Sequence, residues 1–141
     1  MEGLLFVQSE VLTADARAVR EEVFMREQGY VDEFDEVDAR AAHLVLYVDG
    51  EAAGCCRFYA GEAGEWHLGR VAVRKTLRRR GLALRIVREA VERMRALGAA
   101  SVLLGAQVYA RGLYEQCGFA ACGPIYLDEG NPHLPMRLVL H

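Results

Sequence analysis

The feature that most constrains this fold is a strand, a basic turn, a helix and a second strand that follow one another between residues 66 and 106. From Leu82 to Leu97, apolar residues recur every three or four positions and charged residues fill the opposite face. This pattern predicts an amphipathic helix that ends at Gly98. The flanking runs EWHLGRVAV and ASVLLGA are typical of strands. We expect such a unit to be a right-handed crossover with its two strands parallel.

The rest of the chain supplies a second helix and a series of hairpins. Residues 4–8 read as a strand, and Thr13 can cap a helix over 14–28 that stops near Gly29. Asp49-Gly50 lies between two strand-like runs, which is a strong hairpin signal. Beyond residue 106 the pattern predicts a short helix and two last strands, FAACGPIYL and LPMRLVL. The order β-α-β-β-β-α-β-α-β-β predicts an α+β fold, in which helices lie on one mixed sheet.

Length and composition favour one soluble domain over residues 1–141. Hydrophobic residues make up 52% of the chain, which is enough for a core, and no apolar run approaches the ~20 residues of a membrane span. The start of the chain has no positive segment followed by a small-residue cleavage site. Sixteen arginines against one lysine point to a bacterial source. We therefore expect a cytoplasmic protein that does not act on a membrane.

The cysteines form neither a zinc pattern nor the disulfide framework of a secreted protein. The chain has no CxxC pair, and its four histidines are scattered. We expect no metal site. The cysteines are interpreted as reduced packing residues: Cys55, Cys56, Cys117 and Cys122.

Positive charge gathers in one stretch of an otherwise acidic chain. Residues 70–95 hold ten basic and two acidic residues, whereas residues 1–69 hold five basic and fifteen acidic ones. The run RRRGLA (78–83) stands where a helix begins, and free backbone N–H groups at such an end bind phosphate. It is neither a P-loop nor a dinucleotide fingerprint. The alternative is a solvated basic face, and the acidic remainder disfavours a nucleic-acid binder.

Two motifs resemble the GNAT N-acetyltransferase superfamily. Residues 78–83 fit its R-x-x-G-x-A loop for acetyl-coenzyme A, and QVYARGLYEQCGF follows about thirty residues later. VREEVFMREQG, AHLVLY and EGNPHLPM are also similar to a small bacterial subgroup of the YjcF/ElaA type. The resemblance covers essentially the whole chain. It implies a single, mostly antiparallel sheet of six to seven strands, flanked by helices, in which two parallel strands splay apart.

The resemblance also implies a coenzyme site. The backbone amides from Arg79 to Ala83, with Arg78 opening the motif, would hold the pyrophosphate. The pantetheine arm would pair with the free strand edge over 71–73, beside a bulge with which Gly69 is consistent. Gln107 stands where many members carry an asparagine that contacts pantetheine, and it adds a methylene. The full set of expected cofactor-binding residues is Val71, Ala72, Val73, Arg78, Arg79, Arg80, Gly81, Leu82, Ala83 and Gln107.

Two residues are expected to be catalytic. Tyr114 falls at the tyrosine that gives a proton to the leaving thiolate in the family, and the N–H of Val71 would polarise the thioester carbonyl. His67 falls where the histone-acetylating branch has a carboxylate base, and it can act directly or through water. A core tyrosine and a hydrogen-bonded strand histidine are the structural alternatives. Glu65 and His133 are rival bases.

The acceptor end is less defined by the sequence. Residues 27–38 contain six acidic and no basic residues, in a loop that often lines the acceptor pocket in this superfamily. An acidic lining would suit a cationic amine, although charge runs are commonly solvated surface. The aromatic residues that could wall a pocket, or simply complete the core, are Tyr30, Phe34, Trp66 and Tyr126.

The expected activity is acetyl transfer from acetyl-coenzyme A to a primary amine of a small molecule or peptide, by direct attack on the thioester. A sensor that binds acyl-coenzyme A without catalysis is the alternative. Dimers are common among such domains, so a homodimer is compatible with the resemblance. The sequence does not name the acceptor.

Overall fold

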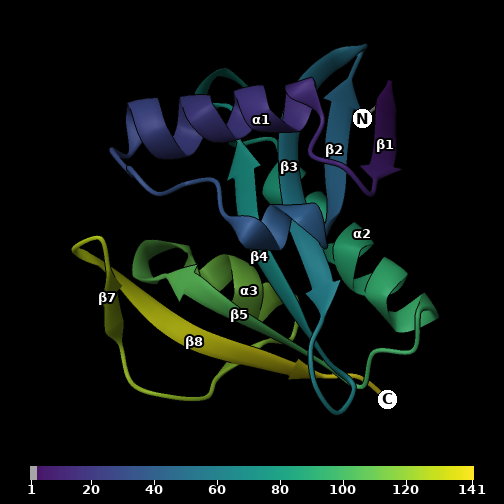
Figure 1. The fold of residues 1–141 in the computed structure, drawn as a ribbon, viewed down its shortest axis with the longest axis vertical. Coiled ribbons are helices and arrows are strands. Elements are labelled where there is room, and N and C mark those ends of the chain that lie inside the picture. The colour runs from purple at the N-terminus through teal and green to yellow at the C-terminus, as the bar shows by residue number, and fades with distance from the viewer. Residues whose placement is uncertain (1–2) are drawn as a thin grey trace.

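The computed structural model describes residues 3–141, which build one eight-stranded sheet with helices on both faces (Figure 1). The strands are β1 (Leu4–Ser9), β2 (Ala42–Val48), β3 (Glu51–Ala60), β4 (Glu65–Val73), β5 (Ser101–Gln107), β6 (Ala120–Ala121), β7 (Tyr126–Asp128) and β8 (Asn131–Val139). The α-helices are α1 (Ala14–Arg20), α2 (Leu82–Ala96) and α3 (Arg111–Gln116). A π-helix (Glu21–Glu27) continues α1, and short 3₁₀ turns span Glu36–Ala39, Lys75–Leu77 and Val108–Ala110.

The sheet has the mixed topology that the sequence predicts. Its strand order is β1-β2-β3-β4-β5-β8-β6, with β7 also paired to β8. β4 and β5 are parallel, and the other pairs are antiparallel. The prediction of one strand over 119–127 is wrong. That segment forms two short strands separated by Gly123-Pro124, because proline has no N–H to donate to a ladder.

Helices on opposite faces of the sheet bury two separate cores. α2 and α3 cover one face, where Phe58, Ile86 and Met94 belong to the larger cluster. α1 lies across β2, β3 and β4 on the other face, where Val45 and Cys55 belong to the smaller cluster (Figure 1). α1 leaves β5 and β8 uncovered on its own face of the sheet (Figure 1).

β4 and β5 separate after a short parallel ladder. They pair only at three positions, Glu65 to His67 with Ser101 to Leu103. Beyond these positions the two strands diverge, and no strand among residues 3–141 lies beside this edge of β4. This is the splayed parallel pair that the resemblance implies.

A bulge lies in β4 just beyond that point. Gly69 pairs with Arg57 and Ala72 pairs with Cys55, so Arg70 and Val71 together face the single residue between those partners. Arg70 has a positive φ of 55°, a conformation that bulges usually give to glycine. The bulge therefore begins at Arg70, one residue after Gly69, where the sequence suggested it. Gly69 itself keeps regular pairing and an extended backbone.

The cysteines differ in their surroundings. Cys55 and Cys56 are buried, and burial raises the pKa of the Cys55 thiol to about 12. Cys117 is half-buried against the core, whereas Cys122 is exposed, so its interpretation as a packing residue is wrong. Over residues 3–141, no helix combines the length and the hydropathy that crossing a membrane requires.

Candidate active site

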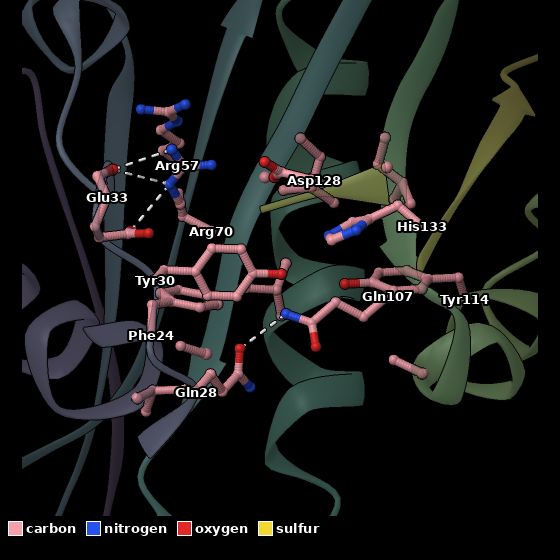
Figure 2. Close-up of a pocket in the computed structure, with 18 of the residues that line it drawn as sticks. Phe24, Gln28, Tyr30, Glu33, Arg57, Arg70, Gln107, Tyr114, Asp128 and His133 are labelled. Atoms are coloured by element: carbon pink, nitrogen blue, oxygen red, sulfur yellow. Dashed lines mark hydrogen bonds and ion pairs between the residues drawn. The ribbon is translucent and has the colours of Figure 1, made fainter. Parts of the chain in front are cut away.

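A cleft of about 780 Å³ opens where β4 and β5 diverge (Figure 2). Its floor is the uncovered face of β5 and β8, where Leu103, Gly105 and His133 lie. One wall is the free edge of β4. The other walls are the end of the π-helix with the loop after it, the β7–β8 hairpin and the start of α3.

The basic loop stands at one end of this cleft. Arg79 and Gly81 have positive φ values of 64° and 73°, with no positive φ at Arg80 between them. When the sign of φ alternates from residue to residue, successive backbone N–H groups point to the same side of the loop. The concave surface that they form binds anions. No side chain caps the first N–H groups of α2, and Arg79 and Arg80 form no ion pair with any residue of 3–141.

Arg78 is engaged differently from its two neighbours. Its Nε donates to the carbonyl of Val73 at 2.9 Å, and its two terminal nitrogens donate to the carboxylate of Glu27 at 2.5 and 2.6 Å. The hydrogen bond from Arg78 lowers the pKa of Glu27. Arg78 therefore ties the basic loop both to the end of β4 and to the π-helix.

The structure brings most of the expected site residues to the cleft. Its lining includes His67, Val71, Ala72, Val73, Arg78, Ala83, Gln107 and Tyr114. Arg79, Arg80 and Gly81 are exposed in the loop at its end. Leu82 is buried in the larger core, so only its backbone is available for a ligand. Glu65 does not line the cleft. Its carboxylate accepts from Arg137 at 2.7 Å and from Ser101 at 3.1 Å.

Tyr114 is anchored in the core by its ring and reaches the cleft with its hydroxyl. The ring packs edge-on against Phe119, with the centroids 6.0 Å apart. Figure 2 shows the hydroxyl pointing into the cleft beside Gln107. Burial raises the pKa of Tyr114, so the phenol is protonated at neutral pH and is available as a hydrogen-bond donor.

The two candidate histidines lie at different levels of the floor. His67 is level with Leu103 of β5, and His133 pairs with Gln107. Four residues of strand separate these levels, or about 13 Å at 3.3 Å per residue. The His67 ring stacks on Tyr59 at 4.9 Å between centroids. His133 is buried and stacks on Tyr126 at 5.6 Å.

One hydrogen bond defines the tautomer of His133. Its Nδ1 lies 2.9 Å from the carbonyl oxygen of Asn131. A carbonyl can only accept, so Nδ1 carries the proton and Nε2 of the neutral ring keeps its lone pair. Figure 2 shows the ring turned into the cleft, where that nitrogen can accept a proton.

The Tyr30 hydroxyl and a pair of hydrogen-bonded glutamines also lie in the cleft. The Tyr30 hydroxyl is buried and has no hydrogen-bond partner among residues 3–141. Gln107 donates to Gln28 at 2.9 Å, and Gln28 donates to the hydroxyl of Tyr109 at 3.2 Å. A buried hydroxyl without a partner costs about 1–3 kcal/mol, so Tyr30 marks a place where a ligand group would be stabilising.

Most of the acidic run 27–38 is neutralised by arginines from other elements. Glu33 binds Arg20 at 2.8 Å and Arg70 at 2.9 Å. Asp38 binds Arg20 at 2.7 Å and Arg57 at 2.9 Å. Asp35 accepts from Arg57 at 2.7 Å. The interpretation of the whole run as a lining for a cation is therefore too broad, because this network fixes the loop with little net charge left over.

Several cleft residues were not identifiable from the sequence. Arg57 and Arg70 had no motif to mark them, whereas Gln28 stands in the segment VREEVFMREQG, and Asp128 and Glu129 stand in the loop DEGNPH that precedes the last strand. Of the expected aromatic walls, Tyr30 and Tyr126 line the cleft. Phe34 lies under the guanidinium groups of Arg17 and Arg20, and Trp66 packs against the larger core.

Comparison with known proteins identifies the family and the fold. A model of the acetyltransferase (GNAT) domain matches residues 10–140. The N-acetyltransferase YjcF of Bacillus subtilis, which is uncharacterised, is 35% identical over 136 residues that cover 94% of this chain and 96% of that protein. An acyl-CoA N-acyltransferase of Pseudomonas aeruginosa has the same fold with a TM-score of 0.83 and 27% identity, covering 95% and 98% of the two chains. Escherichia coli ElaA is similar in fold at the same TM-score and coverage, with 21% identity.

Proposed function

Because the chain belongs to the family of acetyltransferase (GNAT) domains, we propose that it transfers an acetyl group from acetyl-coenzyme A to a primary amine of a small molecule or peptide. The observation that carries this proposal is the single cleft shared by three groups. These are the free edge of β4, the uncapped start of α2 and the hydroxyl of Tyr114. They are the parts that a thioester, a pyrophosphate and a leaving thiolate each require.

The residues at the cleft fit the coenzyme. The backbone N–H groups from Arg79 to Ala83 receive the pyrophosphate, and the free guanidinium groups of Arg79 and Arg80 add charge to it. A Cβ built on Gly81 meets no atom within 4 Å, so the loop leaves open space where a phosphate approaches. The edge over 71–73 pairs with the pantetheine arm, and the amide of Gln107 contacts it after exchanging its bond to Gln28.

Val71 and Tyr114 act on the thioester from two sides. The N–H of Val71, the second residue of the bulge, donates to the thioester carbonyl and stabilises the oxyanion that forms during attack. Tyr114 gives its proton to the thiolate as the carbon–sulfur bond breaks. Burial raises the pKa of this phenol, and it also raises the pKa of a thiol in the same water-poor site, so the transfer between them stays feasible.

His133 takes the proton of the attacking amine. Its Nε2 is unprotonated in the tautomer that Asn131 imposes, and it faces the level of Gln107. His67 lies about 13 Å lower along the floor. It therefore acts only through water, and Glu65 does not act as the base because its carboxylate is bound to Arg137.

A coenzyme sensor without catalysis is the second candidate function. It needs the coenzyme loop and the free strand edge, but it has no use for a proton acceptor with a defined tautomer or for an unpartnered hydroxyl in the same cleft. The arrangement of His133, Tyr30 and Tyr114 thus favours the transferase over the sensor.

Thiol release from acetyl-coenzyme A, followed with a disulfide dye, tests the transferase. The panel contains alkyl diamines, monoamines, amino sugars, amino acids and lysine peptides. Cys122 is exposed and reacts with the dye itself, so the assay uses Cys122→Ser and a coenzyme-only control. Amine-dependent release that Tyr114→Phe reduces is the expected result. Tight coenzyme binding with no release from any amine would replace the transferase with the sensor.

A further inference from the structure

Three carboxylates at the cleft remain outside the arginine network. Asp32, Asp128 and Glu129 line the cleft, and none of them forms an ion pair with a residue of 3–141. They contrast with Glu27, Glu33 and Asp35, which are each bound to a guanidinium group. These three carboxylates therefore carry negative charge that no arginine or lysine of the described chain compensates.

Two backbone hydrogen bonds hold the three carboxylates at one end of the cleft. Glu129 accepts from the N–H of Val31 at 2.9 Å and from the N–H of Asp32 at 3.1 Å. They join the turn of the β7–β8 hairpin to the loop that follows the π-helix. Asp32 and Asp128 thus belong to one surface, although 96 positions of sequence separate them.

Tyr30 provides an independent sign of a ligand in the middle of the cleft, beside these carboxylates. Its side chain is 92% buried, its hydroxyl has no partner in the described chain, and the ring is held edge-on by Phe24 at 6.3 Å. Figure 2 shows the hydroxyl aimed into the cleft, on the side where Asp128 and His133 lie. Burial raises the pKa of Tyr30 and the charge of Asp128 raises it further, whereas the nearby Asn131 side chain, which is outside hydrogen-bond geometry, lowers it.

The hairpin register sets the spacing between base and carboxylate. His133 pairs with Tyr126, and Asp128 lies two residues beyond Tyr126 on the same face of β7. Two residues of strand measure about 7 Å. A molecule with one nitrogen beside His133 and a second beside Asp128 would therefore have its nitrogens roughly that far apart.

We propose that the amine acceptor is an alkyl diamine or a comparable dication, whose second ammonium group binds between Asp32 and Asp128. This inference rests on the proposed acetyl transfer. The reacting nitrogen lies between the Tyr30 hydroxyl and Nε2 of His133. It reacts as the free amine: its lone pair forms the new carbon–nitrogen bond as the carbon–sulfur bond breaks, one N–H proton passes to Nε2 of His133, and Tyr114 protonates the departing sulfur. The proton on His133 then leaves to solvent, and solvent reprotonates Tyr114. The second nitrogen stays protonated and takes no part in the chemistry.

The test compares 1,4-diaminobutane with 1-aminobutane, which differ only in the second ammonium group. We expect kcat/KM to be at least about tenfold higher for the diamine, because one charge-assisted contact contributes roughly 1.4 kcal/mol. Asp128→Asn should bring this ratio close to one, mainly through a higher KM for the diamine. Asp49→Asn is the matched control. It changes the charge equally in the exposed β2–β3 turn and should keep the ratio.

Each other outcome overturns a different statement. Equal kcat/KM for the two amines, or turnover confined to amino acids or amino sugars, refutes the dication and leaves the transferase intact. If Asp128→Asn lowers kcat/KM equally for both amines, Asp128 supports the structure of the hairpin and does not contact the acceptor. Coenzyme binding with no turnover of any amine refutes the transferase itself, and the dication with it.

Discussion

Gly81→Glu should remove most of the affinity for the coenzyme while the fold remains. Gly81 precedes α2 with a φ of 73°, and a Cβ placed there meets no atom within 4 Å. A side chain at this position therefore does not clash. A residue other than glycine in the left-handed region costs roughly 1–2 kcal/mol of folding free energy, which a domain of ordinary stability tolerates.

The loss of binding follows from charge. A carboxylate and one phosphate charge about 5 Å apart repel by roughly 0.8 kcal/mol in a water-like dielectric. The pyrophosphate carries about two such charges, so the penalty is at least about 1.7 kcal/mol, or roughly fifteenfold in Kd. The new carboxylate also neutralises Arg79 or Arg80, which deepens the effect.

Two alanine variants separate charge from backbone strain. Gly81→Ala adds the strain at the loop without the charge. Gly98→Ala adds similar strain at the opposite end of α2, where φ is 93° and the space around a Cβ is also open. Calorimetric titration with coenzyme A gives Kd, and urea unfolding gives stability. If Gly81→Glu binds as tightly as Gly98→Ala, the pyrophosphate does not lie at the start of α2.

Four other substitutions test the site and the ion-pair network that supports it. Tyr114→Phe keeps the packing on Phe119 and should lower kcat about a hundredfold with little change in coenzyme Kd; an unchanged kcat in steady-state assays would transfer thiolate protonation to water. His133→Gln should lower kcat about a hundredfold, whereas His67→Gln should lower it much less; the reverse result in steady-state assays would make His67 the base. Asp38→Asn should cost about 1–3 kcal/mol in urea unfolding, because Arg20 and Arg57 lose their charge-assisted bonds to Asp38 while each keeps one other carboxylate partner. Burial opposes the charge of Asp38, but hydrogen bonds from Arg20 and Arg57 lower its pKa well below the ordinary value. Its contribution is thus complete above about pH 4 and lost as the pH falls further, so the variant should show a flatter acid limb of stability than the wild type.

The sequence predicted those parts of the fold whose signals are local. The apolar period of α2, its end at Gly98 and the hairpin at Asp49-Gly50 each depend on neighbouring residues, and the structure has all three. The strand predicted over 119–127 failed because β6 and β7 form only where they meet β8, on either side of Gly123-Pro124. Partners distant in sequence decide such short strands.

The residues of the candidate site also fall into those that local motifs predict and those that depend on partners distant in sequence. The coenzyme loop and Tyr114 lie within motifs, so their positions at the cleft could be predicted. The acidic run was misjudged because its neutralising arginines, Arg20, Arg57 and Arg70, come from α1, β3 and β4, and sequence spacing does not show which charges will meet. The bulge was assigned to Gly69 because glycine is the usual residue in the left-handed region, a position that Arg70 takes here with its guanidinium bound to Glu33.

The bulge also separates chain length in β4 from the packing of the core. Ala72 packs toward α1 and Val73 toward α2, and the two residues opposite Cys56 absorb the extra length between them and Gly69. Deleting either Arg70 or Val71 would leave a regular strand in which both residues keep their partners and faces, because side chains alternate along a strand. A deletion at the bulge should therefore be tolerated by the fold better than a deletion in the regular part of β4. Such a deletion would still change the edge that the bulge presents to the cleft, so a deletion scan scored by both urea unfolding and thiol release should find the two readouts separated at this point.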